Sequence, residues 1–211
     1  MGIDTIFFIA ILVMSVVIHE VSHGYAANLL GDPTARLEGR LTLNPLKHLD
    51  PFGSIILPLL MFLVPGGIIF GWAKPVPVNP LNFKNLRRGE LMVSAAGILA
   101  NFALAIAAAV IYHFLDALPQ TFPAILGSLL RFTVTINLVL GVFNLFPIPP
   151  LDGSKVLLSQ LPLNLAKQYQ RLEPYGILIL LIFMMIPFGN SSLLQTFLGF
   201  FVRLFSSFLG F

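Results

Sequence analysis

Long apolar runs dominate the pattern of hydrophobic and polar positions along this chain. Three of them, at residues 5–30, 90–115 and 124–146, are long enough to cross a bilayer, because a spanning helix needs about 20 apolar residues. A shorter apolar run at 174–187 predicts a fourth span. Residues 191–211 predict either a fifth span or a helix in the membrane interface. The pattern predicts an all-α polytopic membrane protein with about four to six membrane segments.

The chain between the first two long runs is more broken. Residues 37–43 alternate between apolar and polar positions, which predicts a short strand. Residues 71–80 contain three prolines, which exclude a helix and predict an extended edge strand or loop. Between them, residues 51–70 are apolar but interrupted by proline and glycine, with basic residues on both sides. We therefore predict a re-entrant segment, or a broken helix packed against the protein.

Composition makes lipid the solvent for most of this chain. Of its 211 residues 57% are hydrophobic and 10% are charged, whereas soluble domains carry about 25% charged residues. So few charges cannot cover a soluble surface. Cysteine is absent, which excludes a disulfide framework and a cysteine ligand or nucleophile. Without repeats or a visible soluble segment, residues 1–211 are predicted to form a single membrane-embedded domain.

The distribution of charge predicts an orientation in the cell membrane. The net charge is +3, and no basic run exceeds two residues, so the charge pattern does not suggest a nucleic-acid partner. The predicted turns on the other side of the membrane carry almost no basic residues. Because Lys and Arg are enriched in cytoplasmic loops, three basic segments are predicted to face the cytoplasm: 36–50, 71–90 and 152–173.

A metal-binding motif ends the first apolar run. His19-Glu20-Val21-Ser22-His23 places two imidazoles four residues apart, on one face of a helix, where they can bind one Zn²⁺. Glu20 lies about 100° around that helix, beside the metal, where its carboxylate can take a proton from a zinc-bound water. A chance match is the alternative, but ionisable residues inside a membrane span are costly and mark functional sites.

A catalytic zinc needs a third protein ligand and an open position for water. Sequence spacing alone leaves several candidates: His48, His113, Asp32, Asp50, Asp116, Asp152 and Glu173. Asp152 stands out because it follows a proline-rich break at the end of an apolar helix. Broken helices are where ions bind inside membranes.

These motifs together resemble the site-2 protease family. The first is HExxH on the first apolar helix, and the second is the segment from Asn144 to Asp152-Gly153 late in the chain. Gly97 and Asn101 are similar to the family's Gly-x-x-x-Asn element on the intervening helix. Residues 44–53 and 71–78 are similar to segments of its short forms, so the resemblance extends over about residues 15–157.

The resemblance implies a three-helix catalytic core with a small β or re-entrant element and an active site toward the cytoplasmic side. It implies one zinc ion per chain, held by His19, His23 and Asp152, with Glu20 as the general base. It also implies that Asn144 steadies the substrate backbone or the oxyanion, although a hydrogen bond between helices is an equally good role for it. The chain has no room for a PDZ or CBS domain, as expected for a short form.

The predicted function is therefore an intramembrane zinc metalloprotease. Its substrates are expected to be transmembrane proteins or peptides, cut within or near the lipid bilayer. A non-catalytic pseudoprotease that binds membrane proteins is one alternative, and the intact Glu20 argues against it. A metal transporter is another, but transporters often contain internal repeats, and this chain shows none.

Three smaller predictions concern two polar residues near the motifs and two extended segments. Asn101 is expected to make a hydrogen bond between helices. His48 lies in the predicted inner loop and could reach the metal or the substrate, but it is expected to be a solvated loop histidine. The segments 37–43 and 73–78 are expected to pair with an unwound substrate by strand addition.

Overall fold

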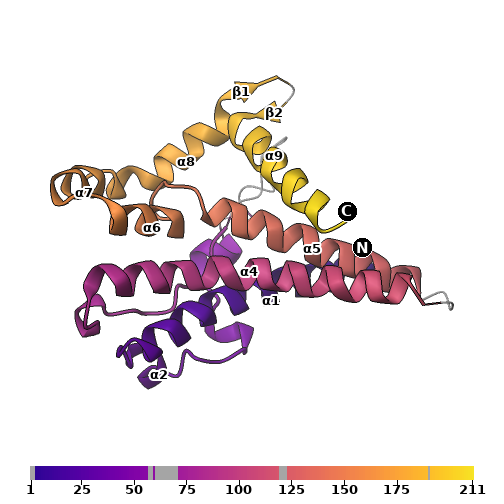
Figure 1. Cartoon of the computed structure of the whole chain (residues 1–211), viewed down its shortest axis with the longest axis horizontal. Coiled ribbons are helices and arrows are strands. Elements are labelled where there is room, and N and C mark those ends of the chain that lie inside the picture. Colours follow the sequence, from indigo (N-terminus) through magenta and orange to yellow (C-terminus); the bar gives the residue numbers. More distant parts are fainter. Residues whose placement is uncertain (1–2, 57–58, 60–70, 119–122, 190) are drawn as a thin grey trace.

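The computed structural model describes residues 3–56, 59, 71–118, 123–189 and 191–211. Three long helices form its centre: α1 (Ile3–Leu29), α4 (Leu86–Asp116) and α5 (Ala124–Asn144). Helix α4 packs against both of the others and lies beside α5 in Figure 1. All three are long and apolar enough to cross a membrane. The predicted all-α polytopic membrane fold is confirmed.

Local sequence signals explain where the long helices begin and end. Helix α1 ends just before Gly31, which adopts a positive φ of 106° that glycine reaches without steric cost. Helix α4 begins four residues before the predicted start, because the side chain of Asn85 accepts a hydrogen bond from the amide of Arg88 and caps the helix. Helix α5 begins directly after Pro123, as proline's lack of an amide donor allows.

Small residues bring α4 and α5 close together. Ala105, Ala108 and Ala109 of α4 form a buried cluster with Val134 and Leu138 of α5. In lipid, helices gain little from the hydrophobic effect and associate through close packing, which small side chains permit. This contact fixes the spacing of the two helices against which α1, the helix with the HExxH motif, packs.

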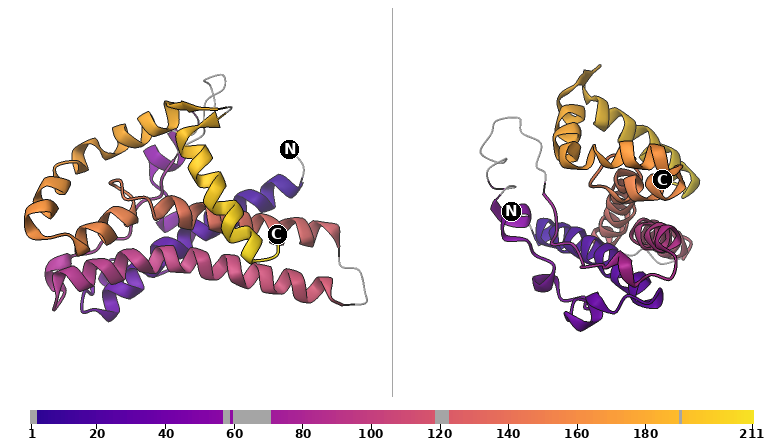
Figure 2. Two further views of the ribbon diagram at one scale, coloured as in Figure 1. Left: turned by 45° about the horizontal axis from the view of Figure 1, so that its top comes forward. Right: turned by 90° about the vertical axis from the view of Figure 1, so that its left-hand side faces the viewer.

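Shorter elements surround this three-helix centre. They are α2 (Thr34–Leu37), η1 (Pro45–Lys47), η2 (Pro51–Ile56), η3 (Pro80–Asn82), α6 (Asp152–Gln160), α7 (Leu163–Gln170), η4 (Glu173–Tyr175), α8 (Gly176–Met185), β1 (Pro187–Phe188), β2 (Ser191–Ser192) and α9 (Leu193–Phe208). Strands β1 and β2 form a two-stranded antiparallel hairpin, with Pro187 opposite Ser192. Figure 2 shows α6 to α9 as an arm that leaves the end of α5 and returns along it.

The predicted strand at 37–43 is wrong. Helix α2 ends at Leu37, and the chain then turns through Gly39, which has a φ of 63°. Residues 71–79 are extended but form no ladder, so the loop alternative is the correct one there. The backbone of this loop is bound by side chains instead, because the buried guanidinium of Arg40 donates to the carbonyls of Lys74 and Pro75.

His48 is buried, with 2% of its surface exposed, so the prediction of a solvated loop histidine is wrong. Its ring Nε2 lies 2.9 Å from the carbonyl of Thr42. Its own carbonyl accepts a hydrogen bond from the amide of Lys74. His48 therefore helps Arg40 to hold the extended loop against the rest of the chain.

Asp32 ties the same loop to the end of α1. Its carboxylate accepts hydrogen bonds from the amide and hydroxyl of Thr34, the amide of Asn79 and the side chain of Asn82. Burial raises the pKa of Asp32, but these donors outweigh burial and hold the pKa below its ordinary value. The loop is thus fixed beside the helix end that carries HExxH.

Two other predicted segments have different outcomes. The predicted re-entrant segment at 51–70 begins with the π-helix η2, but residues 57–58 and 60–70 lie outside the described residues. That interpretation stays a prediction.

The predicted fourth span at 174–187 contains α8, whose ten residues reach about 15 Å. A hydrocarbon core is about 30 Å thick, so α8 alone is too short to cross it.

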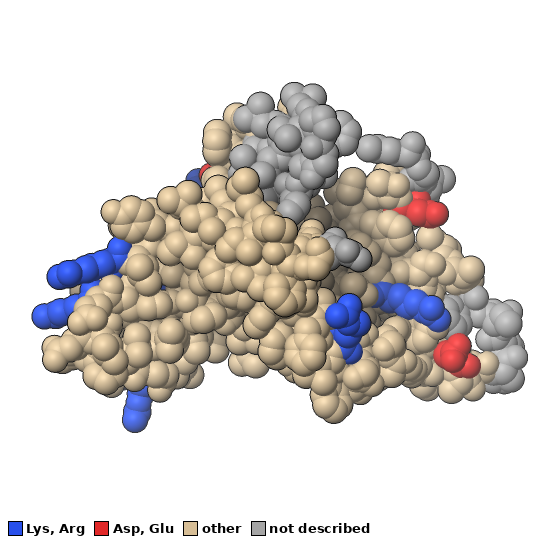
Figure 3. Space-filling view, turned by 90° about the horizontal axis from the view of Figure 1, so that it is seen from above, with Lys and Arg blue, Asp and Glu red and all other residues tan. Residues whose placement is uncertain are grey.

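The end of α1, the start of α4 and the end of α5 lie toward the same end of the molecule (Figure 1). Most of the surface in Figure 3 is free of Lys, Arg, Asp and Glu, as lipid contact requires. A group of Lys and Arg side chains lies at the left-hand end of Figure 3. Helix α7 and the start of α4 lie at that end in Figure 1. The end of the molecule that holds α7 and the start of α4 is therefore rich in Lys and Arg.

Candidate metal centre

His19 and His23 project from one face of α1. Their Nε2 atoms lie 3.0 Å apart, and 7% and 8% of the two residues is exposed. This face is turned toward α4 and α5, because α1 packs against both helices. The four-residue spacing that the sequence predicts to converge does converge here.

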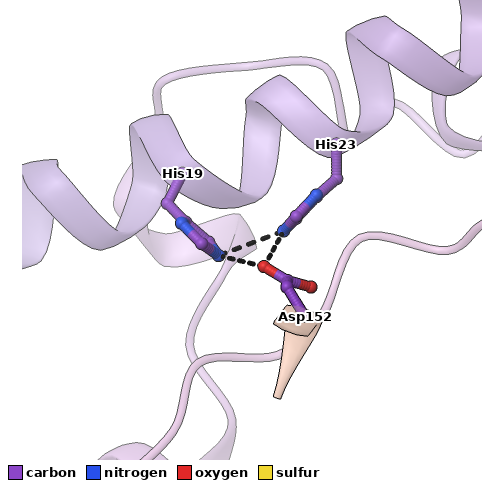
Figure 4. A group of neighbouring side chains, drawn as sticks. All are labelled: His19, His23 and Asp152. Atoms are coloured by element: carbon purple, nitrogen blue, oxygen red, sulfur yellow. Dashed lines mark hydrogen bonds and ion pairs between the residues drawn. The ribbon is translucent and has the colours of Figure 1, made fainter. Parts of the chain in front are cut away.

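Asp152 completes a group of three side chains (Figure 4). It is the first residue of α6, after the proline-containing segment that follows α5. Its Oδ2 lies 3.1 Å from Nε2 of His19 and 3.1 Å from Nε2 of His23. The fold thus brings together residues that are 129 positions apart in sequence (152 − 23).

Among the described residues, these three form the one group of at least three His, Cys, Asp or Glu side chains with ligand atoms close enough to share a metal. The other candidates that the sequence left open lie outside it: His48, His113, Asp32, Asp50, Asp116 and Glu173. His113, for example, lies near the far end of α4 and bonds to the carbonyl of Leu209.

The hydrogen-bond partners of the imidazoles fit a metal between these three side chains. Nδ1 of His23 lies 2.7 Å from the carbonyl of Val93, and Nδ1 of His19 lies 2.7 Å from Oδ1 of Asn101. Both partners can only accept, so each Nδ1 carries the ring hydrogen. The Nε2 lone pairs then face each other and the carboxylate.

Three electron-rich atoms at this spacing need a cation between them. Oδ2 of Asp152 is buried and has no hydrogen-bond donor among the described residues. Ligands about 2.0 Å from a tetrahedral zinc lie about 3.3 Å from one another, close to the observed 3.0–3.1 Å. Two neutral imidazoles and one carboxylate also suit zinc chemically.

Two glycines make room for this arrangement. A Cβ added to Gly97 of α4 would lie 2.5 Å from the ring of His23 and 2.7 Å from that of His19. A Cβ added to Gly153 would lie 2.2 Å from the carbonyl oxygen of Leu145, at the end of α5. The glycine of the Gly-x-x-x-Asn element thus admits the imidazoles, and the glycine after Asp152 lets α6 start against α5.

We expect Gly97→Ala to weaken metal binding strongly, because the new methyl group displaces both imidazoles. A displacement of this size is expected to cost about 10- to 100-fold in zinc affinity, as loss of a ligand's supporting contacts does. Competition with a chromogenic chelator on the purified protein measures it. Gly141→Ala is the matched control, because the atoms nearest to its Cβ belong to the ring of Phe102, at 3.1 Å, and not to a metal ligand. Equal zinc affinity in the two variants would contradict this role of Gly97.

Glu20 stands beside the group and not within it. It is half-buried, and its Oε2 accepts a hydrogen bond of 3.0 Å from the amide of Val76, in the extended loop. That loop is held in turn by Arg40 and by the carbonyl of His48. One carboxylate oxygen is therefore anchored to a fixed backbone amide, and the other accepts no hydrogen bond from the described residues.

Asn144 is the last residue of α5 and is half-buried. Its side-chain amide donates to the carbonyl of Leu140, one turn earlier in the same helix. This is neither the predicted bond between helices nor a contact with the three-residue group. A role on the substrate stays a prediction, and it requires this amide to exchange its partner.

Sequence reasoning underestimated one residue and missed two. Asn101 does make the predicted bond between helices, but its oxygen also meets the ring of His19. Asn137 and Ser15 extend this set of buried polar side chains. Their only signal in the sequence was a polar residue inside an apolar run, which in lipid always needs a partner.

Comparison with known proteins places this geometry in a family context. The model of peptidase family M50 matches residues 7–122 and 116–187. YwhC of Bacillus subtilis, provisionally named as a zinc metalloprotease, is 37% identical over 89% of this chain and 84% of its own length. Rip2 of Mycolicibacterium smegmatis, also provisionally so named, is 32% identical over 88% of this chain and 69% of its own length.

A more distant relative is the zinc metalloprotease MJ0392 of Methanocaldococcus jannaschii. It is 28% identical over 70% of this chain, which corresponds to 32% of its own length. No solved structure is a significant match to this chain.

Proposed function

This chain belongs to peptidase family M50, the site-2 protease family that its motifs resemble, and from this membership and its geometry we propose how it works. It is a zinc metalloprotease embedded in the membrane, and its substrates are membrane proteins. The observation that carries the proposal is the convergence of His19, His23 and Asp152 beside Glu20. We assign these three as the zinc ligands and Glu20 as the general base.

The residues divide the chemistry between them. His19, His23 and Asp152 would hold the zinc ion, which when bound would acidify a water molecule and polarise the peptide carbonyl. The carboxylate oxygen of Glu20 that does not bond to Val76 accepts the proton of the attacking water and returns it to the leaving amine. The Val76 amide keeps the carboxylate of Glu20 in place while the proton moves. Asn144 stays a candidate donor to the oxyanion.

The extended loop supports a binding site for the substrate backbone. In a helix the peptide groups are hydrogen-bonded to one another and are not accessible to a protease. A helical substrate must therefore unwind before it is cut. We propose that residues 73–78 pair with the unwound segment by strand addition. Since Val76 of the same loop bonds to Glu20, this pairing positions the scissile bond near the general base.

We expect the purified protein to hold one zinc ion per chain and to lose it, together with cleavage of membrane substrates, when a strong chelator is added. Added zinc is expected to restore both properties. Elemental analysis and a cleavage assay in liposomes measure the two effects. A wild-type protein without zinc, unchanged by His23→Ala, would exclude the proposed metal centre.

We also propose a cell-membrane location with the active site toward the cytoplasm. The hydrogen bonds from the amide of Lys74 to the carbonyl of His48 and from the amide of Trp72 to the carbonyl of Gly53 support a location of segments 36–50 and 71–90 on the same side of the membrane. Their basic residues favour the cytoplasmic side. We propose further that residues 1–211 form one domain, because α6 packs on α4 and α9 packs on α5.

Cysteine labelling is expected to place both loops inside the cell. The chain has no native cysteine, so Leu46→Cys and Lys84→Cys each introduce a single reactive thiol. Both are expected to resist an impermeant maleimide in intact cells and to react in inverted vesicles, with Asp116→Cys showing the opposite behaviour. Labelling of Leu46→Cys and Lys84→Cys from opposite sides would overturn this topology.

A further inference from the structure

A chain of buried polar side chains runs across the three long helices behind His19. Ser15 belongs to α1, Asn101 to α4 and Asn137 to α5, and both asparagines are completely buried. Polar groups at such depth cost free energy unless each finds a hydrogen-bond partner. The identity of those partners determines what the chain of side chains does.

The hydrogen bonds form a continuous path from α5 to the metal ligand. Asn137 Nδ2 donates to the carbonyl of Thr133 and to the hydroxyl of Ser15, at 2.9 Å each. Asn101 Nδ2 donates to Asn137 Oδ1 at 2.9 Å. Asn101 Oδ1 lies 2.7 Å from Nδ1 of His19. The path therefore joins a backbone carbonyl to an imidazole through two amides.

The Thr133 carbonyl gives this path a direction. A carbonyl only accepts hydrogen bonds, so Asn137 must turn its NH₂ toward Thr133 and its oxygen toward Asn101. That oxygen also only accepts, so Asn101 must turn its own NH₂ toward Asn137 and its oxygen toward His19. The imidazole must then carry its hydrogen on Nδ1, which leaves the lone pair of Nε2 directed at the metal position.

The reversed arrangement is excluded by the same contacts. If Asn101 turned its NH₂ to His19, its oxygen would face the Asn137 oxygen unless Asn137 turned as well. A turned Asn137 would bring its own oxygen to 2.9 Å from the Thr133 oxygen, where two acceptors repel each other. His23 also carries its ring hydrogen on Nδ1, but no other side chain intervenes, because this nitrogen faces the Val93 carbonyl directly. For His19, the two asparagines act as a relay from the Thr133 carbonyl. The Val93 carbonyl thus sets the tautomer of His23 directly. The Thr133 carbonyl sets that of His19 through Asn137 and Asn101, and a longer contact of 3.5 Å from Asn101 Nδ2 to the Ser15 carbonyl acts in the same sense.

We propose that Asn137 is a positioning residue that acts through Asn101 to keep His19 in its metal-binding tautomer. Asn137 touches neither the metal position nor His19, and its effect is the orientation of one amide. This inference rests on the proposed zinc site. It predicts that loss of Asn137 frees Asn101 to turn its NH₂ toward His19, which favours a hydrogen on Nε2 and blocks that ligand.

The test compares zinc affinities of the full-length protein in detergent by competition with a chelator. Asn137→Leu is expected to bind zinc about 10-fold more weakly than wild type, within the range for outer-shell partners. Thr135→Val is the matched control, since it removes a hydroxyl of the same helix that bonds only to its own turn and is exposed. It is expected to bind zinc as wild type does.

Rescue separates positioning from a merely structural role. A carboxylate at position 101 only accepts hydrogen bonds, so it cannot present a donor to His19 whichever way it turns. Adding Asn101→Asp to Asn137→Leu is therefore expected to restore most of the lost affinity. Unchanged affinity in Asn137→Leu, or loss that Asn101→Asp leaves uncorrected in a folded protein, would overturn the proposal.

A measurement on the wild-type protein covers the case in which the variants fail to fold. The chain has four histidines, and ¹⁵N spectra of the zinc-free protein at alkaline pH distinguish protonated from bare ring nitrogens. His19 is expected to carry its hydrogen on Nδ1, and a hydrogen on Nε2 would refute the relay. Absence of zinc binding by the wild-type protein would instead refute the proposed metal centre itself, on which this inference rests.

Discussion

Glu20→Gln is expected to lower the rate of peptide hydrolysis by at least about 10²- to 10⁴-fold, the usual contribution of general acid–base catalysis. Glutamine has the same shape, and its side-chain oxygen can still accept the hydrogen bond from the Val76 amide. It cannot take a proton from water at neutral pH. Geometry and metal binding are therefore kept while the proton-transfer step is lost.

The measurement combines cleavage with metal analysis. Membranes from cells that produce the wild-type chain should contain peptide ends that are absent from cells with Glu20→Gln, and these ends name the substrates. The zinc content of the two purified proteins should be equal. Glu38→Gln is the matched control, because Glu38 lies exposed at the end of α2.

The same variant separates the competing functions. A pseudoprotease or a metal transporter does not need a general base, so partner binding or metal transport should survive Glu20→Gln. Wild-type levels of new peptide ends in the variant would remove Glu20 from the mechanism.

Asp152→Asn is expected to abolish most activity and to weaken zinc retention while leaving expression and membrane insertion intact. Oδ2 of Asp152 lies 3.1 Å from Nε2 of both imidazoles and has no hydrogen-bond donor among the described residues. A neutral amide is a much poorer zinc ligand than a carboxylate, and its NH₂ would face the Nε2 lone pairs as a donor. Loss of a residue that only supports a metal ligand costs about 10- to 100-fold in affinity. Here a ligand itself is lost, so we expect the zinc affinity to fall by at least about 100-fold.

The competing role for Asp152 is that of a turn residue before glycine. Asparagine replaces aspartate well in turns, because it also bonds to nearby backbone groups. Asp50 supplies the matched control, since its Oδ1 accepts from the amide of Gly53 in such a local contact. Asp50→Asn should keep zinc and activity. Near-normal zinc binding by Asp152→Asn would show that Asp152 shapes the chain and does not bind metal.

The local features of this protein followed from sequence because their causes are local. A run of about 20 apolar residues in lipid must satisfy its own backbone, and a helix does so within the segment. Helices α1, α4 and α5 were predictable for this reason. The four-residue spacing of His19 and His23 places them on one face of any helix, so their pairing was predictable as well.

Short segments without that constraint were harder to predict. The alternation at 37–43 suggested a strand, but two or three alternating positions occur equally well in a turn, and Gly39 makes one there. His48 looked like a solvated loop residue, yet the fold buries it against the loop that follows. Arg40, next to that turn, and His48 both bond to the backbone of Lys74, which lies about 25 to 35 residues further along the chain. A local sequence pattern cannot reveal contacts at that separation.

The sequence by itself thus determined the membrane class, the three long helices and the HExxH face. Motif resemblance pointed to Asp152. Gly97 was visible only as part of the Gly-x-x-x-Asn element, and Asn101 was predicted only to make a hydrogen bond between helices. The tertiary structure alone decided that Asp152 meets the two imidazoles, that Gly97 clears space for them and that Asn137 lies behind Asn101. The reason is physical: helical periodicity acts over a few residues, whereas these contacts join helices that only packing brings together.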